Sequence, residues 1–118
     1  MVDAMIRLYC SAPLTNGGTQ PMTEERKQAF RDAAGKLREA GFDVVNPVEL
    51  DEAEDCTDWT WQQFMKRDLH FLLDCDGIAT LYGWQESEGA RFEVDVAKRL
   101  GFRVAPHFVW TELEALVK

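Results

Sequence analysis

Short apolar runs alternate with helical periodicities four times along this chain, and this alternation restricts the fold more than any other feature. The apolar runs cover residues 5–10, 42–45, 78–82 and 103–108. Helical patterns follow them at residues 24–40, 61–73, 90–100 and from Thr111 onward. Strands that alternate with helices form a parallel sheet with helices on both of its faces, so we expect a doubly wound α/β fold.

Capping residues place the ends of the helices. Thr23 can cap the first helix and Gly41 can end it. The stretch Thr60–Gln63 is a capping box before the second helix, and Thr111–Glu114 is another, which we expect to start the last helix.

The connections and edges complete the predicted topology. Because crossovers are right-handed, we favour a flavodoxin-like or Rossmann-like sheet of four or five strands in the order 2-1-3-4. Pro106 indicates that the fourth strand lies near an edge. The acidic stretch 48–59 is predicted to be a solvated loop, with a mobile lid as the alternative.

Size and charge exclude several classes of function. We expect residues 1–118 to form a single domain, long enough to bury a core. A formal net charge of −8 argues against a nucleic-acid partner or an anionic membrane surface, although one nucleotide in a shaped pocket is compatible with it. The sequence contains neither a signal peptide nor an apolar run of membrane-spanning length, so a cytoplasmic protein is expected.

The residues that most often bind metals are not spaced as a metal site. His70 and His107 have no partner at ligand spacing. The three cysteines are odd in number and also lack a metal motif, so we interpret Cys10, Cys56 and Cys75 as reduced thiols. We therefore expect no metal and no cofactor.

Two carboxylates occupy helical positions that the periodicity assigns to apolar side chains. In the pattern 90–100, Glu93 falls on the apolar side, and in the pattern 61–73, Asp68 falls one turn after Phe64 in the apolar stripe. A carboxylate facing a core is unfavourable unless it is paired, protonated or lines a cavity. A single acid of this kind is about as often a structural residue, held by backbone N–H groups, as a functional one. Two of them, on helices that flank one strand, favour a functional site.

The predicted strand order brings these acids to one crevice. The first strand ends at Tyr9 and Ser11, the third ends near Gly83, and ligands bind where such strands diverge at a switch point. The crevice has neither a P-loop lysine nor a G-x-G-x-x-G fingerprint. Paired carboxylates suit glycosidic-bond chemistry, in which one acid attacks or stabilises the anomeric carbon and another group handles protons.

Three short motifs follow one another in the second half of the chain. They are Arg67–Leu69 on a helix, Cys75–Ile78 at a strand and Ser87–Glu93 beyond it. In order and spacing they resemble the nucleoside 2-deoxyribosyltransferase superfamily and its relatives, the deoxynucleoside 5′-monophosphate N-glycosidases. With Val45–Pro47 and Gly83-Trp84, the resemblance to a small, often phage-associated branch covers nearly the whole chain.

The resemblance implies roles for particular residues. Glu93 matches the nucleophile of the family, Asp68 matches the aspartate that assists at the sugar and the base, and Tyr9 matches the tyrosine of the first strand, which would orient Glu93. The expected substrate-binding residues lie in the loops around these three: Ser11, Ala12, Pro13, Asn46, Gly83, Trp84, Ser87 and Gly89.

The substrate and the reaction remain open at this point. Ser87 stands where the transferases have an aspartate, as in the nucleotide N-glycosidases, yet Glu86 and Glu88 beside it would repel a 5′-phosphate. Hydrolysis and transfer to a second base are both compatible with the sequence. A non-catalytic nucleoside- or nucleotide-binding module and a partner-binding domain that uses its tryptophans are the alternatives. The resemblance also implies a homodimer or larger homo-oligomer.

Overall fold

The computed structural model describes residues 5–12 and 23–117, with side chains as far as residue 112. Four parallel strands form its sheet: β1 (Arg7–Ser11), β2 (Asp43–Val45), β3 (Gly77–Thr80) and β4 (Arg103–Pro106). Their order is β2-β1-β3-β4, which confirms the predicted order 2-1-3-4 and the edge position of the fourth strand.

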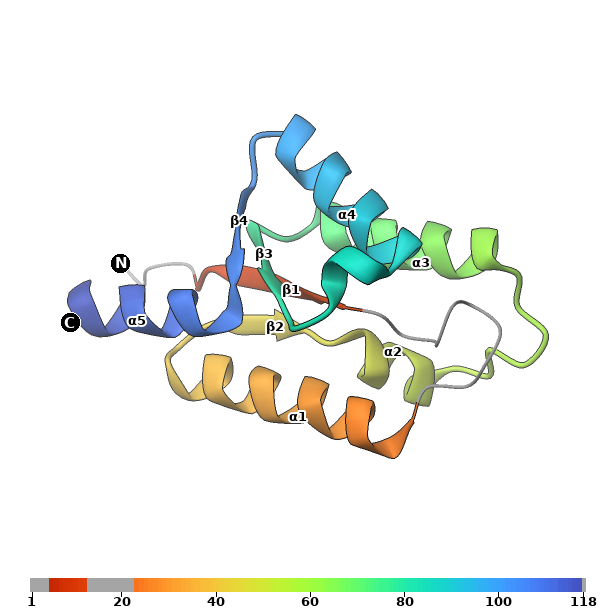
Figure 1. Ribbon diagram of the computed structural model, residues 1–118, viewed down its shortest axis with the longest axis horizontal. Coiled ribbons are helices and arrows are strands. Elements are labelled where there is room, and N and C mark those ends of the chain that lie inside the picture. The colour runs from red at the N-terminus through yellow and green to blue at the C-terminus, as the bar shows by residue number, and fades with distance from the viewer. Residues whose placement is uncertain (1–4, 13–22, 118) are drawn as a thin grey trace.

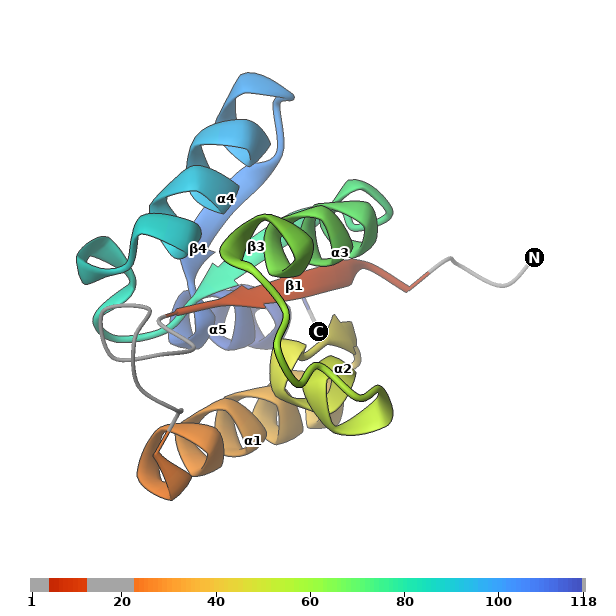
Figure 2. The same ribbon diagram turned by 90° about the vertical axis from the view of Figure 1, so that its right-hand side faces the viewer.

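Helices cover both faces of the sheet. The helices α3 (Trp61–Leu73) and α4 (Glu88–Arg99) lie on one face, and α1 (Glu24–Glu39) and α5 (His107–Val117) lie on the other (Figure 1). Figure 2 views the sheet from the end at which the short helix α2 (Pro47–Ala53) lies, with α3 and α4 above the sheet and α1 below it. The fold is therefore the doubly wound α/β arrangement that the alternation predicts.

Each face of the sheet has its own apolar core. Toward α1 and α5, side chains such as Phe30, Leu37 and Trp110 pack against β1 and β3. Toward α3 and α4, Leu72 and Val94 pack against the other side of the same strands. Large apolar side chains are buried on both faces of the two central strands. Each such side chain stabilises the fold by roughly 1.5–3 kcal/mol, so together they hold these strands in place.

Two sequence-based boundaries were wrong. Residues 47–53 form helix α2 rather than a loop, because the Asn46 side chain accepts a hydrogen bond from the Val48 backbone N–H and Pro47 occupies the first turn. The last helix begins at His107 rather than at Thr111, whose hydroxyl instead donates to the Phe108 carbonyl oxygen inside the helix. The short 3-10 turn η1 (Trp84–Glu86) lies within the predicted loop before α4.

Within residues 5–12 and 23–117, no helix is long and apolar enough to cross a membrane. The three cysteines are free thiols, of which Cys10 and Cys75 are buried.

Candidate active site

Helix α4 carries Glu93 into the space between the helix and the sheet. The helix starts at Ser87, whose hydroxyl accepts a hydrogen bond from the Ala90 backbone N–H at 3.2 Å. Its buried side is made of Ala90, Glu93, Val94 and Ala97, as the periodicity predicts. Only 5% of Glu93 is exposed. A small apolar helix face therefore holds one carboxylate close to the end of β1.

Two hydroxyl groups from β1 bind the Glu93 carboxylate. The Tyr9 hydroxyl donates to Oε2 at 2.6 Å, and the Ser11 hydroxyl donates to Oε1 at 3.0 Å. Tyr9 and Ser11 point to the same side of β1 because they are two residues apart on a strand. Each carboxylate oxygen thus has one donor, and the side chain is fixed in orientation. Both of these donors are side-chain hydroxyls of β1 rather than backbone N–H groups of α4.

Asp68 is the second buried carboxylate, and it comes from α3. It is 1% exposed, and Arg67 donates to its Oδ1 from Nε at 3.0 Å and from Nη2 at 2.7 Å. The salt bridge is itself buried, because the Arg67 side chain is only 9% exposed. A capping box between Thr60 and Gln63 starts α3 and so sets the helical phase that turns Asp68 inward.

Burial changes the protonation of both carboxyl groups. Desolvation, followed by the charge of Asp68, raises the pKa of Glu93 to about 8, although the hydroxyls of Tyr9 and Ser11 oppose this rise. Desolvation also raises the pKa of Asp68 to about 6, against the lowering effect of Arg67. Because the two acids disfavour each other's ionisation, they titrate as a pair, in which Glu93 has the higher pKa.

Both carboxylates line one cleft with a volume of about 530 Å³. Its wall on the α3 side is aromatic and sulfur-containing, formed by Trp59, Trp61, Phe64 and Met65. The rings of Trp59 and Phe64 pack with their centroids 5.2 Å apart and their planes tilted by 58°. The remaining lining residues come from α1, α2, η1, α4 and the end of β1: Ala12, Lys27, Val48, Asp51, Glu52, Glu86, Ser87, Glu88, Gly89, Ala90 and Arg91. The cleft thus combines a flat apolar wall with a buried pair of acids.

Several predicted site residues gather at this cleft. Ala12, Ser87 and Gly89 line it, and Ser11 lies beneath it with its hydroxyl bound to Glu93 rather than free for a ligand. A β-carbon at Gly89 would lie 3.2 Å from the Met65 sulfur, so any other residue there would displace the Met65 side chain by a few tenths of an ångström.

Other predicted binding residues lie elsewhere. Asn46, Gly83 and Trp84 are not among the described residues that line the cleft. Asn46 caps α2, and its amide nitrogen is buried without a hydrogen-bond partner. Gly83 adopts φ = 87° before η1, and Trp84 packs against the core under α4. Pro13 lies outside the described residues.

The sequence interpretation missed the acidic wall of the cleft and the part that α3 plays in the aromatic one. The periodicity places Trp61 and Phe64 in the apolar stripe of α3, yet Trp61 is 42% exposed and both side chains line the cleft. Asp51 and Glu52 were assigned to a loop, whereas α2 brings both to the cleft. The signal that could have found them is the Asn-Pro pair at residues 46–47, which serves as a helix cap followed by proline in the first turn.

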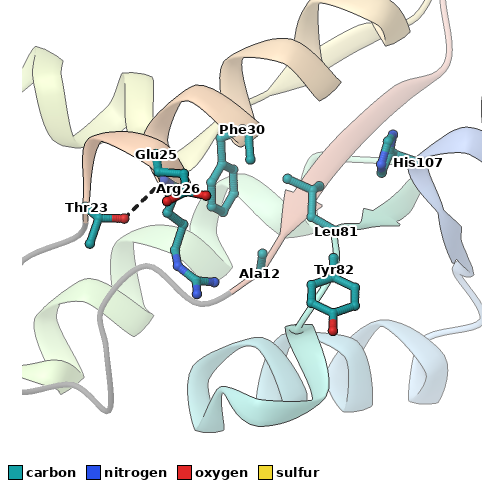
Figure 3. A pocket seen from close by; sticks show the side chains of 9 residues that line it. Ala12, Thr23, Glu25, Arg26, Phe30, Leu81, Tyr82 and His107 are labelled. Atoms are coloured by element: carbon teal, nitrogen blue, oxygen red, sulfur yellow. Dashed lines mark hydrogen bonds between the residues drawn. The ribbon is translucent and has the colours of Figure 1, made fainter.

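A smaller cavity of about 360 Å³ lies on the α1 and α5 side of the sheet. Arg26 and Phe30 of α1 face Ala12, Leu81 and Tyr82 across it (Figure 3). It contains neither buried carboxylate, so the larger cleft is the better candidate for chemistry. Among the residues that the structure describes, no cluster of three His, Cys, Asp or Glu side chains is arranged to hold a metal ion.

Comparisons with known proteins agree with this architecture. A solved structure of a 2-deoxyribosyltransferase from the psychrotolerant bacterium Bacillus psychrosaccharolyticus shares the fold, with a TM-score of 0.64. The two chains are 24% identical, and the match covers 83% of this chain and 69% of that one. No curated protein sequence matches the chain. The family model described as a domain of unknown function, DUF4406, matches residues 6–106, which include all four strands of the sheet, and the chain therefore belongs to that family.

Proposed function

We propose that this protein cleaves the N-glycosidic bond of nucleosides, or of their 5′-monophosphates, with Glu93 as the nucleophile. The proton of the acid pair, which the higher pKa of Glu93 places on that residue, first passes to Asp68. A Glu93 carboxylate oxygen then bonds to the anomeric carbon while the bond from that carbon to the base nitrogen breaks. The electron pair of the broken bond leaves with the base, which takes a proton from Asp68. The product is a glycosyl ester of Glu93 and a free base.

The second step releases the sugar from Glu93. Water, or the ring nitrogen of a second base, attacks the anomeric carbon and gives its proton to Asp68 as the ester bond breaks. Glu93 is then a carboxylate again, and Asp68 holds the proton needed for the next turnover. Water as the acceptor makes the protein a hydrolase, and a second base makes it a transferase.

The aromatic wall supports a nucleobase as the leaving group. Trp59, Trp61, Phe64 and Met65 present flat, polarisable surface on the side of the cleft that also holds Asp68. Planar bases stack on such side chains, with about 1–3 kcal/mol per stacked base. A base held there has its glycosidic nitrogen on the Asp68 side of the cleft, which is where a proton donor is required.

One observation carries this proposal. A buried glutamate and a buried aspartate share one cleft, and the glutamate is aimed by two hydroxyl groups at 2.6 and 3.0 Å. Burying two acids is costly even with these partners, Arg67 for Asp68 and two hydroxyls for Glu93, unless the acids serve a task. The fold shared with a 2-deoxyribosyltransferase at a TM-score of 0.64 adds independent support.

A panel assay tests the proposal. Purified protein is incubated with purine and pyrimidine nucleosides and deoxynucleosides and their 5′-monophosphates, with and without a second base, and free base is measured by chromatography. Base release supports the enzyme. Thermal stabilisation by a nucleoside without base release would contradict it and select a binding module.

A further inference from the structure

Arg67 connects the catalytic aspartate of the proposed reaction to α2. Its Nε and Nη2 donate to Asp68 Oδ1 at 3.0 and 2.7 Å, and Nη2 also donates to Asp51 Oδ1 at 2.6 Å. The Arg67 guanidinium is thus shared between one acid that is buried and one whose side chain is 31% exposed at the cleft.

The remaining sides of the guanidinium are also occupied. Its central carbon lies 5.3 Å from the Trp59 ring centroid and 5.5 Å from that of Phe64, and Nη1 donates to the Cys56 sulfur at 3.4 Å. Arginine suits this position because its planar fork both stacks and donates several hydrogen bonds in fixed directions. The side chain is therefore held in one geometry, at a fixed distance from Asp68.

The proposed reaction needs the acid pair in one particular state. Glu93 must be ionised to attack, and Asp68 must hold a proton for the leaving base, so the pair must carry one proton. A cation beside the pair favours loss of that proton, and further anions favour a second proton. The number of protons that the pair holds is therefore sensitive to the charges around Asp68.

We propose that Arg67 is a positioning residue that sets how many protons the Asp68–Glu93 pair holds, and that Asp51 tempers its effect. The role in turnover rests on the proposed function. The protonation of the pair can be measured without any substrate, so this inference and the proposed function can fail separately.

Other titratable and charged groups also face the pair and the cleft. Tyr9 donates to Glu93 from β1, and Cys56 contacts Arg67 from the segment before α3. Around the cleft stand Glu52 of α2, Lys27 of α1, Glu86 of η1, and Glu88 and Arg91 of α4. With Arg67, these groups include three cations: Lys27, Arg91 and Arg67. Of these three, only Arg67 forms a hydrogen bond with an acid of the pair in the described part of the chain, whereas Lys27 and Arg91 bond elsewhere.

Two substitutions should move the acid pair in opposite directions. Arg67→Met keeps an unbranched side chain but removes the cation, so both apparent pKa values of the pair should rise, by about 1–3 pH units. Asp51→Asn removes an anion and leaves Arg67 to Asp68 alone, so the pKa values should fall. Both are read from the carboxyl carbon signals of ¹³C-labelled protein in a pH titration, with Arg67→Lys expected to restore most of the wild-type values.

The opposite signs separate this role from a merely structural one. Loss of packing alone would change stability in both variants without moving the two titrations apart. If Arg67→Met does not fold, Asp51→Asn tests the proposal by itself, through the expected fall of the pKa values. Unchanged carboxyl titrations in Asp51→Asn, or in Arg67→Met where it folds, would overturn the proposal.

The same variants extend the test to turnover on a confirmed nucleoside. Both limbs of the profile of kcat/KM against pH should shift to higher pH in Arg67→Met and to lower pH in Asp51→Asn. Absence of base release in the wild-type protein, with the titrations moving as expected, would sink the proposed function and leave the assignment of Arg67 standing. Turnover with limbs that do not move in either variant would overturn the role of Arg67 in catalysis.

Discussion

At the scale of single residues, Glu93 is the most informative side chain, because it is buried, is held in one orientation and has a raised pKa. A carboxylate that is 5% exposed has lost most of its hydration, and two hydroxyl donors replace only part of it. Such a group is a better nucleophile when ionised but is harder to ionise. The role of Glu93 can therefore be tested by measuring both the activity and the stability of a variant at this position.

The first prediction concerns activity. Glu93→Gln keeps the size of the side chain, and its amide oxygen can accept a hydrogen bond from one of the two hydroxyls while its amide nitrogen donates to the other, but it cannot form the ester. We expect base release to fall by about 10³-fold or more. The matched control is Asp95→Asn on the exposed side of the same helix, which removes a surface pair with Arg99 and should leave turnover near wild type. Near-normal turnover in Glu93→Gln would contradict the mechanism.

The second prediction concerns stability against pH. The pKa of Glu93 is raised from 4.5 to about 8, so between these values the folded protein holds a proton that the unfolded chain has lost. The contribution of Glu93 to stability therefore falls as pH rises from about 4.5 to about 8. Glu93→Gln removes this dependence, so its advantage in Tm over wild type should grow from pH 5 to pH 8. A constant difference in thermal unfolding would show that the pKa is not raised.

At the scale of elements, Trp110 holds α5 closely against the sheet. Trp110 of α5 donates from its indole nitrogen to the Ile78 carbonyl oxygen at 2.9 Å, and its ring also packs edge-on against Phe42. The indole lies so close to β3 that a β-carbon on Gly77 would come within 2.9 Å of it and of the Arg103 carbonyl oxygen. The glycine is therefore required by packing.

The third prediction uses this contact. Gly77→Ala should destabilise the protein by about 1–3 kcal/mol, because neither the backbone of β4 nor the buried indole can give way easily. Gly35→Ala is the matched control: it lies inside α1 with no atom within 4 Å of the new β-carbon, and it should stabilise by roughly 0.5–1 kcal/mol. Urea unfolding measures both, and equal effects of the two alanines would contradict the packing argument.

The walls of the cleft also determine which substrates it favours. Its acidic lining residues outnumber its basic ones. Lys27 is bound to Glu24 at 3.3 Å, and Arg91 donates to the Gln85 carbonyl oxygen at 2.8 Å. The acidic lining residues are Asp51, Glu52, Asp68, Glu86, Glu88 and Glu93, and the basic lining residues are Lys27 and Arg91.

The fourth prediction follows from that imbalance. A nucleoside should be used with a kcat/KM roughly 10-fold or more above that of its 5′-monophosphate at low salt, because the acidic cleft repels phosphate. The preference should shrink as salt rises. Glu86→Gln with Glu88→Gln should reduce it, whereas Glu39→Gln with Asp95→Asn, equal in charge but outside the cleft, should not. Preference for the monophosphate would contradict this reading of the charges.

At the scale of the whole molecule, exposed aromatic side chains lie beside the cleft. Trp61 and Phe92 meet edge to face at 6.3 Å between centroids, and they are 42% and 45% exposed. Side chains of this kind are enriched at interfaces between proteins. They support the prediction of a homodimer or larger homo-oligomer that the family resemblance implies.

The fifth prediction is therefore self-association. Light scattering at high micromolar concentration should give a mass of at least twice 13.5 kDa. Trp61→Ser with Phe92→Ser should lower that mass if these two residues form the interface. A monomer at this concentration would exclude the predicted assembly.

The sequence by itself determined the alternation of the four strands with α1, α3, α4 and α5, the sheet topology and the inward phase of Glu93 and Asp68. These features depend on local periodicity, capping residues and the handedness of crossovers, all of which can be read from neighbouring residues. Phase along a helix was enough to turn both acids toward the core, as their exposures of 5% and 1% confirm.

Only the tertiary structure decided what surrounds those acids. Ser11 as a second donor to Glu93, the sharing of Arg67 between Asp51 and Asp68, and the aromatic wall all join residues that are distant in sequence or lie on different elements. No periodicity encodes such contacts, because they depend on how α2, α3 and α4 pack around the end of β1. The acidic stretch that begins α2 carried no apolar pattern of its own, and its place against the cleft follows from the cap at Asn46 and the burial of Val48.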